Sequence, residues 1–389
     1  MIKKLLLKFS SLLYRVHLYI NQICSEKASS ISNFVPYTLN YQPSQSSIKI
    51  IHFNGNFIIG GTSQLIVDII ERTSDKYTHK IVVPEYPIPL PYQPVNINMF
   101  SLYEMAKLFE YLKQENPTLV HIHYWVRHIH RHEYFAYWYE AVFKICEELN
   151  IKVIQNINVP TRPFVSKTIA HNVFVSKYVQ ENFDNHLSIS SVIYPGSNFQ
   201  HFQNNDIHAL PNNAIGMVYR LDQDKLNANA IEVFITAVKK DPKIICYIIG
   251  GGYFLEYYKE RVAAEQLEKS FTFTGVVSYS LLPEYYKRFS VFVAPVHDES
   301  FGQVTPFAMS MGLSVVGYNT GALSEILGYN DTLVDYGNIE GLADVIINLV
   351  KDPEERIKLG QINQERAHQN FSVESMINGY RDLYDSYTT

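Results

Sequence analysis

The stretch KIICYIIGGGY, residues 243–253, is an apolar run that ends directly in three glycines. A short apolar run bounded by a turn signal predicts a buried β-strand. Runs of the same kind alternate with helical patterns from Ile48 onward, among them IKIIHF, HKIVVP, LVHIHY, IKVIQNI and HNVFVS. Strands that alternate with helices are typical of a parallel sheet joined by crossover helices. The sequence therefore predicts an α/β fold.

A polar, turn-rich stretch, QNNDIHALPNN at residues 203–213, interrupts this alternation once. The alternation then restarts with AIGMVYRL and continues through SFTFTGVV, SVFVAP and LSVVGYN. A chain of 389 residues is also too long for one ordinary core. We therefore expect two doubly wound, Rossmann-like domains, residues 48–204 and 205–370, with ligands bound in the cleft between the carboxyl ends of their strands.

Composition excludes some classes of partner. The net charge of -5 provides no basic field for recruiting nucleic acid. Cys24, Cys146 and Cys246 lie far apart in the sequence, so neither a disulfide scaffold nor a cysteine zinc site is indicated. A reducing cytoplasm fits this cysteine usage best.

Residues 1–24 have the pattern of an amphipathic helix, with apolar residues on one face and lysine or arginine elsewhere. Such a helix suits either an anionic membrane surface or docking on its own protein. Lys8 and Arg15 interrupt the apolar run, which argues against a spanning helix and against a signal peptide. Residues 25–47, rich in serine and asparagine, are predicted to be a linker.

Charged groups follow two predicted strands of the second half. Arg220 comes just after one strand, and Lys225 lies five residues further on. A guanidinium fork and an ammonium point charge together suit a diphosphate. Glu299 begins the stretch ESFGQVTPFAMSMG, in which a glycine turn precedes a helix whose free N–H groups suit a phosphate. The glycines after Ile249 would let a nucleotide approach the backbone, although ordinary turns give the same pattern.

The order of these segments resembles the retaining glycosyltransferases of family 4, which have the GT-B fold. In the second half the resemblance is carried by R-x4-K, the strand with three glycines, FTGVVSYSLLPEYYKRFSVFVAP, ESFG…AMSMG and TGALSEIL. In the first half it is carried by FIIGGTSQLIVDI, LVHIHYW and SVIYPGSNFQHF. No single segment is specific, but their order extends from about residue 48 to the C-terminus. The resemblance implies two Rossmann-like domains facing across a cleft, with residues 371–389 as a helix that crosses back to the first domain.

The resemblance also implies roles for individual residues. Arg220 and Lys225 match the pair that neutralises the donor diphosphate, and Glu299 matches a glutamate that lies against the donor sugar; these three are the candidate catalytic residues. The candidate donor-binding residues are Gly60, Gly61, Gly250, Gly251, Phe301, Gly302, Gln303, Val304 and Phe307. The family needs no metal or other cofactor, because its cations and helix ends stabilise the leaving group.

Two positions depart from the family pattern. Phe307 stands where the family's second glutamate usually binds the ribose hydroxyls, so a charge-assisted hydrogen bond is lost. Loss of such a bond costs on the order of 1.5 to 3 kcal/mol, which weakens donor binding without abolishing transfer. The Phe307 ring either packs in an altered pocket that still binds the donor or indicates that the protein has lost donor binding. Asn156 and Asn158 lie where the family often has a histidine.

A histidine-rich stretch, HIHYWVRHIHRHE at residues 121–133, allows two interpretations. His121 and His123 alternate on a predicted strand, so they share one face and could bind zinc. Arginines in the same stretch would repel a cation, so we predict no metal site. We expect this loop to contact the acceptor, because aromatic faces with polar edges suit sugars. The candidate acceptor-binding residues are His123, Tyr124, Trp125, Asn156 and Asn158.

Taken together, these features predict a metal-independent, retaining glycosyltransferase of the hexosyltransferase type that acts in cell-envelope or surface polysaccharide synthesis. It would move a sugar from a nucleotide diphosphate sugar to a glycan, lipid-linked or small-molecule acceptor. The expected location is the cytoplasm, with or without attachment to the inner face of the membrane through residues 2–23. Two alternatives stay open. One is a non-catalytic GT-B protein that binds a glycan or partner. Phe307 argues for this alternative, and the three catalytic candidates argue against it. The other is a sugar-nucleotide epimerase.

Overall fold

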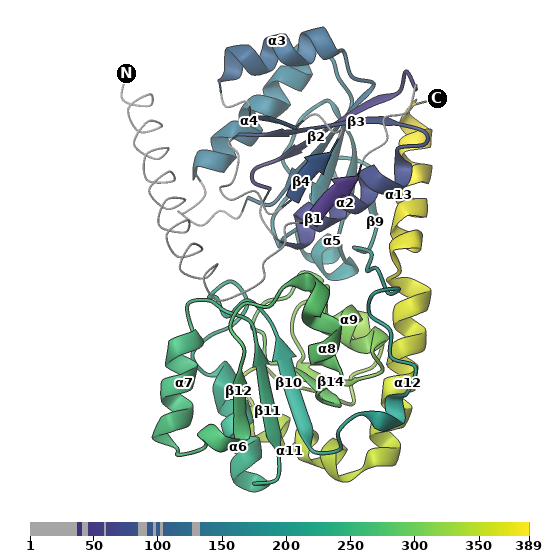
Figure 1. Cartoon of the computed structure of the whole chain (residues 1–389). Helices are drawn as coiled ribbons and strands as arrows, with labels where there is room; N and C mark the ends of the chain where they lie inside the picture. Colours follow the sequence, from purple (N-terminus) through teal and green to yellow (C-terminus); the bar gives the residue numbers. More distant parts are fainter. Residues whose placement is uncertain are drawn as a thin grey trace. The chain divides into compact units, whose positions relative to one another are not determined.

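The computed structural model describes residues 37–40, 46–57, 60–84, 92–95, 99–101, 104–126 and 133–388 (Figure 1). The chain divides into an N-terminal unit, residues 1–193 with 377–389, and a C-terminal unit, residues 194–376. Each unit is built on one large parallel sheet, which confirms the predicted α/β fold with two Rossmann-like domains. The helix predicted at residues 1–24 lies outside the described residues.

The large sheet of the N-terminal unit has the strand order β5-β3-β2-β6-β7-β8-β9. Its strands are β2 Lys49–Asn54, β3 Thr78–Val83, β5 Met99–Ser101, β6 Leu119–Tyr124, β7 Val153–Ile157, β8 Ile169–Phe174 and β9 Ser190–Val192. All six residues of β6 are buried, so its histidines lie inside the unit. The order of the strands reverses between β2 and β6, and open parallel sheets bind ligands at such a switch point.

The sheet of the C-terminal unit has the strand order β12-β11-β10-β13-β14-β15. Its strands are β10 Ala214–Val218, β11 Ile245–Ile249, β12 Phe271–Phe273, β13 Val291–Ala294, β14 Ser314–Tyr318 and β15 Leu333–Val334. The opening stretch of apolar residues and glycines is therefore β11 and the turn after it. The switch point of this sheet lies between β10 and β13.

Helices connect the strands of both sheets (Figure 1). Those of the N-terminal unit are α2 Gly61–Thr73, α3 Met105–Glu115, α4 Glu133–Glu148 and α5 Lys177–Phe183. Those of the C-terminal unit are α6 Ala230–Lys240, α7 Leu255–Ala264, α8 Leu282–Tyr286, α9 Val304–Ser310, α10 Leu323–Leu327, α11 Ile339–Lys351 and α12 Pro353–Asn370, with 3-10 turns at Ile207–Ala209, Glu268–Ser270 and Tyr279–Leu281. Among the described helices, none combines the length and the hydropathy needed to cross a bilayer.

The last helix, α13 Val373–Thr388, belongs to the N-terminal unit from Ile377 onward. Its Tyr380 and Tyr384 are fully buried there. The Tyr380 hydroxyl donates to Asn156 Oδ1 at 2.6 Å, and the Tyr384 hydroxyl lies 2.7 Å from His121 Nδ1. Polar contacts with the sheet therefore help to hold the end of the chain on this unit.

The segment 25–47, predicted to be a linker, contains a strand in its described part. β1, Tyr37–Asn40, pairs in parallel with β4, Tyr92–Val95. These four residues, YTLN, include tyrosine and threonine, which favour strands. The strand was missed because the segment as a whole is rich in serine and asparagine.

Candidate active site

The three candidate catalytic residues lie beside the switch point of the C-terminal sheet. Arg220 and Lys225 follow β10, whereas Glu299 follows β13, and these strands are neighbours in the sheet. Neighbouring parallel strands end at the same edge of their sheet, so residues that follow them come close. The fold therefore brings Lys225 and Glu299 into contact although 74 positions separate them in the sequence.

Lys225 and Glu299 form a largely buried ion pair. Lys225 Nζ donates to Glu299 Oε1 at 2.6 Å, with 20% of the lysine side chain and 2% of the glutamate side chain exposed. Glu299 Oε2 is also buried, and it meets no hydrogen-bond donor among the described residues. An unpaired buried carboxylate oxygen is costly unless a ligand supplies the missing donor. The pair therefore offers a ligand one accepting oxygen with an ammonium group next to it.

Two glycines let the chain close around Glu299. Gly302 has a φ of 71°, and a Cβ at this position would overlap the Glu299 carboxyl group. Gly321 has a φ of 56°, and a Cβ there would overlap the Glu299 carbonyl oxygen. The Ala322 N–H donates to that carbonyl at 2.9 Å. Gly302, predicted to bind the donor, thus also makes room for the glutamate, a contact that sequence reasoning missed.

Arg220 forms a separate and exposed ion pair. Its Nη2 donates to Asp224 Oδ2 at 2.7 Å, and its side chain is 62% exposed. Asp224 follows Arg220 by four residues, so the pairing could have been noticed in the sequence. Ion pairs this exposed contribute little free energy, so Arg220 can exchange Asp224 for an anionic ligand at small cost.

The glycine triplet packs closely against its neighbours. At Gly250 the φ is 130°, and a Cβ would overlap the Tyr219 carbonyl oxygen. At Gly251 a Cβ would lie 2.8 Å from Val276 Cγ2. Both glycines therefore have a structural reason to be there, whether or not they also contact a ligand.

The segment after Glu299 is fixed by side chains of its own unit. Phe301 is 3% exposed and lies between the rings of Tyr194 and Phe371, with centroids 5.7 and 5.4 Å away. Gln303 donates its side-chain amide to the Gly196 carbonyl at 3.0 Å. These contacts hold the turn in place and leave its backbone, rather than these two side chains, to meet a ligand.

Phe307 is a core residue of the C-terminal unit. It lies in α9, the helix that Val304 begins, and it is 6% exposed. Its ring stacks on that of Phe202 with a centroid distance of 3.9 Å and an interplanar angle of 14°. The edge contact with Tyr279, at 5.9 Å, completes an aromatic cluster. Where the resemblance leads one to expect a ribose-binding carboxylate, the chain thus has a packed aromatic ring.

Gly60 and Gly61 lie at the start of α2 in the N-terminal unit. The backbone of Gly60 is extended, and its carbonyl accepts from Gln64 N–H at 3.0 Å. Among the described residues, no atom lies within 4 Å of the position that a Cβ of Gly60 would take. Packing within the described chain therefore does not explain the glycine at position 60.

The candidates at the end of β6 are mostly buried. His123 is fully buried and Tyr124 is 5% exposed, and burial raises the pKa of Tyr124 to about 12. Trp125 is half-buried and donates its indole N–H to Asn54 Oδ1 at 3.0 Å. Of these three, Trp125 is the most accessible to an acceptor. The residues 127–132 of the same stretch lie outside the described part of the chain.

Asn156 and Asn158 form a directed chain of hydrogen bonds at the end of β7. Asn156 accepts from Tyr380 and donates through Nδ2 to Asn158 Oδ1, in each case at 2.6 Å. Within the described chain no acceptor meets Asn158 Nδ2. Asn156 therefore fixes the orientation of the Asn158 amide, whose Nδ2 is a buried donor without an acceptor among the described residues.

Comparison with known proteins places these residues in a family context. The model of the family described as Glycosyl transferases group 1 matches residues 198–366. The capsular polysaccharide biosynthesis glycosyltransferase CapM of Staphylococcus aureus is 26% identical over 235 residues, which are 57% of this chain and 60% of CapM. An uncharacterized glycosyltransferase of Methanocaldococcus jannaschii, MJ1178, is 26% identical over 216 residues, 55% of this chain and 58% of that protein. The matched segments thus span less than two thirds of either relative.

Solved structures of low sequence identity share the fold. HepE of Anabaena, in complex with UDP and glucose, superposes with a TM-score of 0.69 at 15% identity and covers 87% of this chain and 100% of HepE. Sucrose-phosphate synthase of Thermosynechococcus elongatus gives a TM-score of 0.69 at 17% identity, with 87% and 98% covered. Residues 198–366, which contain Arg220, Lys225 and Glu299, therefore form a Glycosyl transferases group 1 domain in a chain of the GT-B fold.

Proposed function

We propose that this protein is a retaining glycosyltransferase that transfers a sugar from a nucleotide diphosphate sugar to a glycan, lipid-linked or small-molecule acceptor. The observation that carries the proposal is the buried Lys225–Glu299 pair inside the group 1 domain, with Glu299 Oε2 unpartnered among the described residues. A UDP-sugar is the first donor to test, because HepE has been crystallised with UDP-glucose. Synthesis of a capsular or other surface polysaccharide is the proposed context, since the relative CapM is named for that role.

In this mechanism Lys225 and Arg220 stabilise the negative charge that develops on the departing diphosphate. Glu299 accepts a hydrogen bond from a hydroxyl of the donor sugar through Oε2 and so orients the sugar. The acceptor attacks from the face that the diphosphate leaves, so the anomeric configuration is retained and no covalent intermediate on the protein is needed. Because the two side chains supply the positive charge, the proposed transfer step uses no metal.

The remaining candidates fall into two groups. The donor is proposed to meet the glycine turns and the segment after Glu299, that is Gly60, Gly61, Gly250, Gly251, Phe301, Gly302, Gln303 and Val304. The acceptor is proposed to meet Trp125 and Asn158, with His123, Tyr124 and Asn156 positioning them. Attachment to a membrane through residues 2–23 stays a prediction, because these residues lie outside the described chain.

Nucleotide binding tests the proposal directly. Isothermal calorimetry with UDP, GDP, ADP and their common sugar conjugates is expected to show saturable binding of one nucleotide. Lys225→Ala is expected to weaken it about ten- to a hundredfold, since a charge-assisted hydrogen bond of about 1.5 to 3 kcal/mol is lost. Glu299→Gln is expected to lower turnover of the sugar nucleotide. The matched control is Glu256→Gln, which breaks an exposed pair with Lys259 at 2.8 Å in the same unit.

The outcomes separate three cases. If the wild type binds a nucleotide and Lys225→Ala and Arg220→Ala bind it with the same affinity, the nucleotide lies elsewhere. Binding without any transfer or hydrolysis across a panel of acceptors would favour the non-catalytic alternative. In the third case the wild type binds no nucleotide but the Phe307→Glu variant does. This result would mean that the aromatic ring has replaced a donor contact that the site requires.

A further inference from the structure

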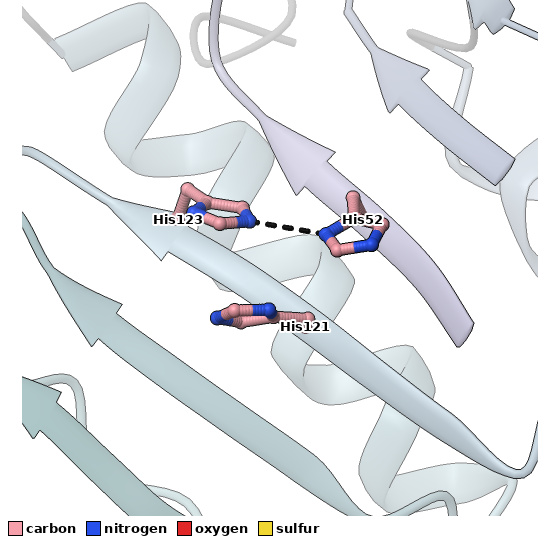
Figure 2. A group of neighbouring side chains, drawn as sticks. All are labelled: His52, His121 and His123. Atoms are coloured by element: carbon pink, nitrogen blue, oxygen red, sulfur yellow. Dashed lines mark hydrogen bonds between the residues drawn. The ribbon is translucent and has the colours of Figure 1, made fainter. Parts of the chain in front are cut away.

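Three buried histidines meet at the switch point of the N-terminal sheet (Figure 2). His52 lies on β2, and His121 and His123 lie on the neighbouring strand β6. His52 is the register partner of His121, and Asn54 is that of His123, so all three imidazoles project from the same face of the sheet. Each of the three side chains is fully buried. The sequence shows only the pair on β6, for which the nearby arginines argued against a metal site; the third histidine comes from a separate strand.

The ring nitrogens are close enough to share an ion. One nitrogen from each histidine lies within 4.8 Å of one from each of the others. His52 Nδ1 and His123 Nε2 are 3.2 Å apart. Two imidazole nitrogens bound to one tetrahedral zinc at 2.0–2.1 Å lie about 3.3 to 3.4 Å from each other. This pair therefore already has the separation of two ligands, and His121 offers a third ring nitrogen within 4.8 Å.

The outer nitrogens of two of the three histidines, His52 and His121, are held as they are in metal-binding histidines. Thr73 donates its hydroxyl proton to a carbonyl one turn earlier in α2, so its oxygen accepts from His79 Nε2 at 2.9 Å. His79 Nδ1 must then accept from His52 Nε2, at 3.0 Å, which leaves the lone pair of His52 Nδ1 turned toward the cluster. His121 Nδ1 is held by the Tyr384 hydroxyl. Bonds of this kind fix the ring orientation and tautomer of metal ligands.

Two nitrogens of the cluster lack any partner among the described residues, namely His121 Nε2 and His123 Nδ1. Buried polar atoms are normally hydrogen-bonded, so each such atom calls for an explanation. A metal ion would give His121 Nε2 a partner.

We propose that His52 Nδ1, His121 Nε2 and His123 Nε2 bind a divalent transition-metal ion of the zinc type. Imidazole ligands suit zinc and its neighbours rather than magnesium or calcium. A water or hydroxide completes the tetrahedron, since no carboxylate or thiolate joins the group in the described part of the chain. When His123 binds through Nε2, its proton moves to Nδ1. The site belongs to the N-terminal unit, whereas Lys225 and Glu299 belong to the C-terminal unit, and its role is to hold β2, β6 and α13 together.

Metal content of the full chain, produced without a polyhistidine tag, tests the site. Mass spectrometry of the protein as purified is expected to find close to one zinc per chain. After unfolding with a chelator, refolding with cobalt is expected to give the visible absorption bands of tetrahedral Co²⁺, and refolding with zinc is expected to raise the melting temperature. Refolding is used because the site is fully buried. These readouts do not depend on transferase activity, so the site can fail while the proposed function stands.

A matched pair of histidine variants locates the ion. His121→Gln is expected to abolish the cobalt bands and the zinc-dependent rise in melting temperature. His171→Gln is the control, because His171 lies on β8 of the same sheet with both ring nitrogens already paired, to Tyr387 and Ser191. The proposal is wrong if the wild-type protein contains no metal and does not respond to zinc or cobalt on refolding. The histidines would then form only a hydrogen-bonded chain of neutral side chains. Equal cobalt bands in both variants would also overturn the proposal.

Discussion

Phe307 packs in the core of the C-terminal unit. Its ring is 6% exposed and stacks on Phe202 at 3.9 Å, so truncation creates a cavity that the neighbouring rings fill only partly. Phe307→Ala is expected to lower the free energy of unfolding by about 3 to 5 kcal/mol. Urea unfolding measures this change. Tyr253→Ala, at a side chain that is 71% exposed, is the control and is expected to change stability by less than about 0.5 kcal/mol. Equal effects of the two substitutions would mean that Phe307 does not pack as described.

Gly302 controls the position of Glu299. Gly302→Ala introduces a Cβ that overlaps the glutamate carboxyl group, at a φ of 71° that costs roughly 1 to 2 kcal/mol for any other residue. We expect a loss of sugar-nucleotide turnover well beyond the loss of stability. Gly337→Ala is the matched control, because its φ of 84° carries a similar strain while no described atom lies within 4 Å of the new Cβ. Steady-state kinetics and urea unfolding of both variants check the prediction, and similar losses of turnover in the two would refute it.

At the scale of elements, α13 is expected to depend on the hydroxyl of Tyr380. Tyr380→Phe removes the donor to Asn156 Oδ1 and leaves a buried acceptor unpaired, at a cost of about 1 to 3 kcal/mol. Hydrogen exchange is expected to accelerate in the part of α13 from Ile377 onward. Tyr137→Phe, on α4 with a side chain 41% exposed, is the control and is expected to change neither stability nor exchange. Unchanged exchange in α13 after Tyr380→Phe would show that apolar packing alone holds the helix.

Most strands of the two sheets could be predicted from the sequence because they are short apolar runs with a turn after them, as in β11 and its glycines; β5 and β15, of three and two residues, could not. Lys225 and Glu299 come into contact because they follow strands that the fold makes neighbours. The contacts that decide their roles could not be predicted, since they join distant positions: Phe307 meets Phe202, and His121 meets His52. A sequence pattern gives the period and the order of elements, whereas the partner of a buried side chain depends on tertiary packing. The short strand β1 escaped notice for a related reason, because its pairing partner β4 lies far along the chain.

The two units share one plan. Read in chain order, both sheets place their first strand beside the fourth, at the switch point, and both have a polar cluster near that point. In the C-terminal unit the cluster is the Lys225–Glu299 pair at the strand ends, inside the Glycosyl transferases group 1 domain. In the N-terminal unit it is the set of histidines within the strands, fully buried. Similar topology therefore supports one cluster that is placed to meet a ligand and another that is placed to hold the fold.

The separate roles of the two clusters predict which residues a bound nucleotide will protect from hydrogen exchange. A ligand that binds only the folded state stabilises it by about 2.7 kcal/mol when its concentration is a hundred times its Kd. With saturating UDP, slower hydrogen exchange is expected in residues 219–225 and 299–303, which contain the catalytic candidates. β2 and β6 are expected to respond to zinc instead. Lys225→Ala should remove the UDP effect and leave the zinc effect intact, because its charge belongs only to the first site. If UDP slows hydrogen exchange in β2 and β6 but not in residues 219–225 and 299–303, the nucleotide binds in the other unit. The donor site would then have to be reassigned.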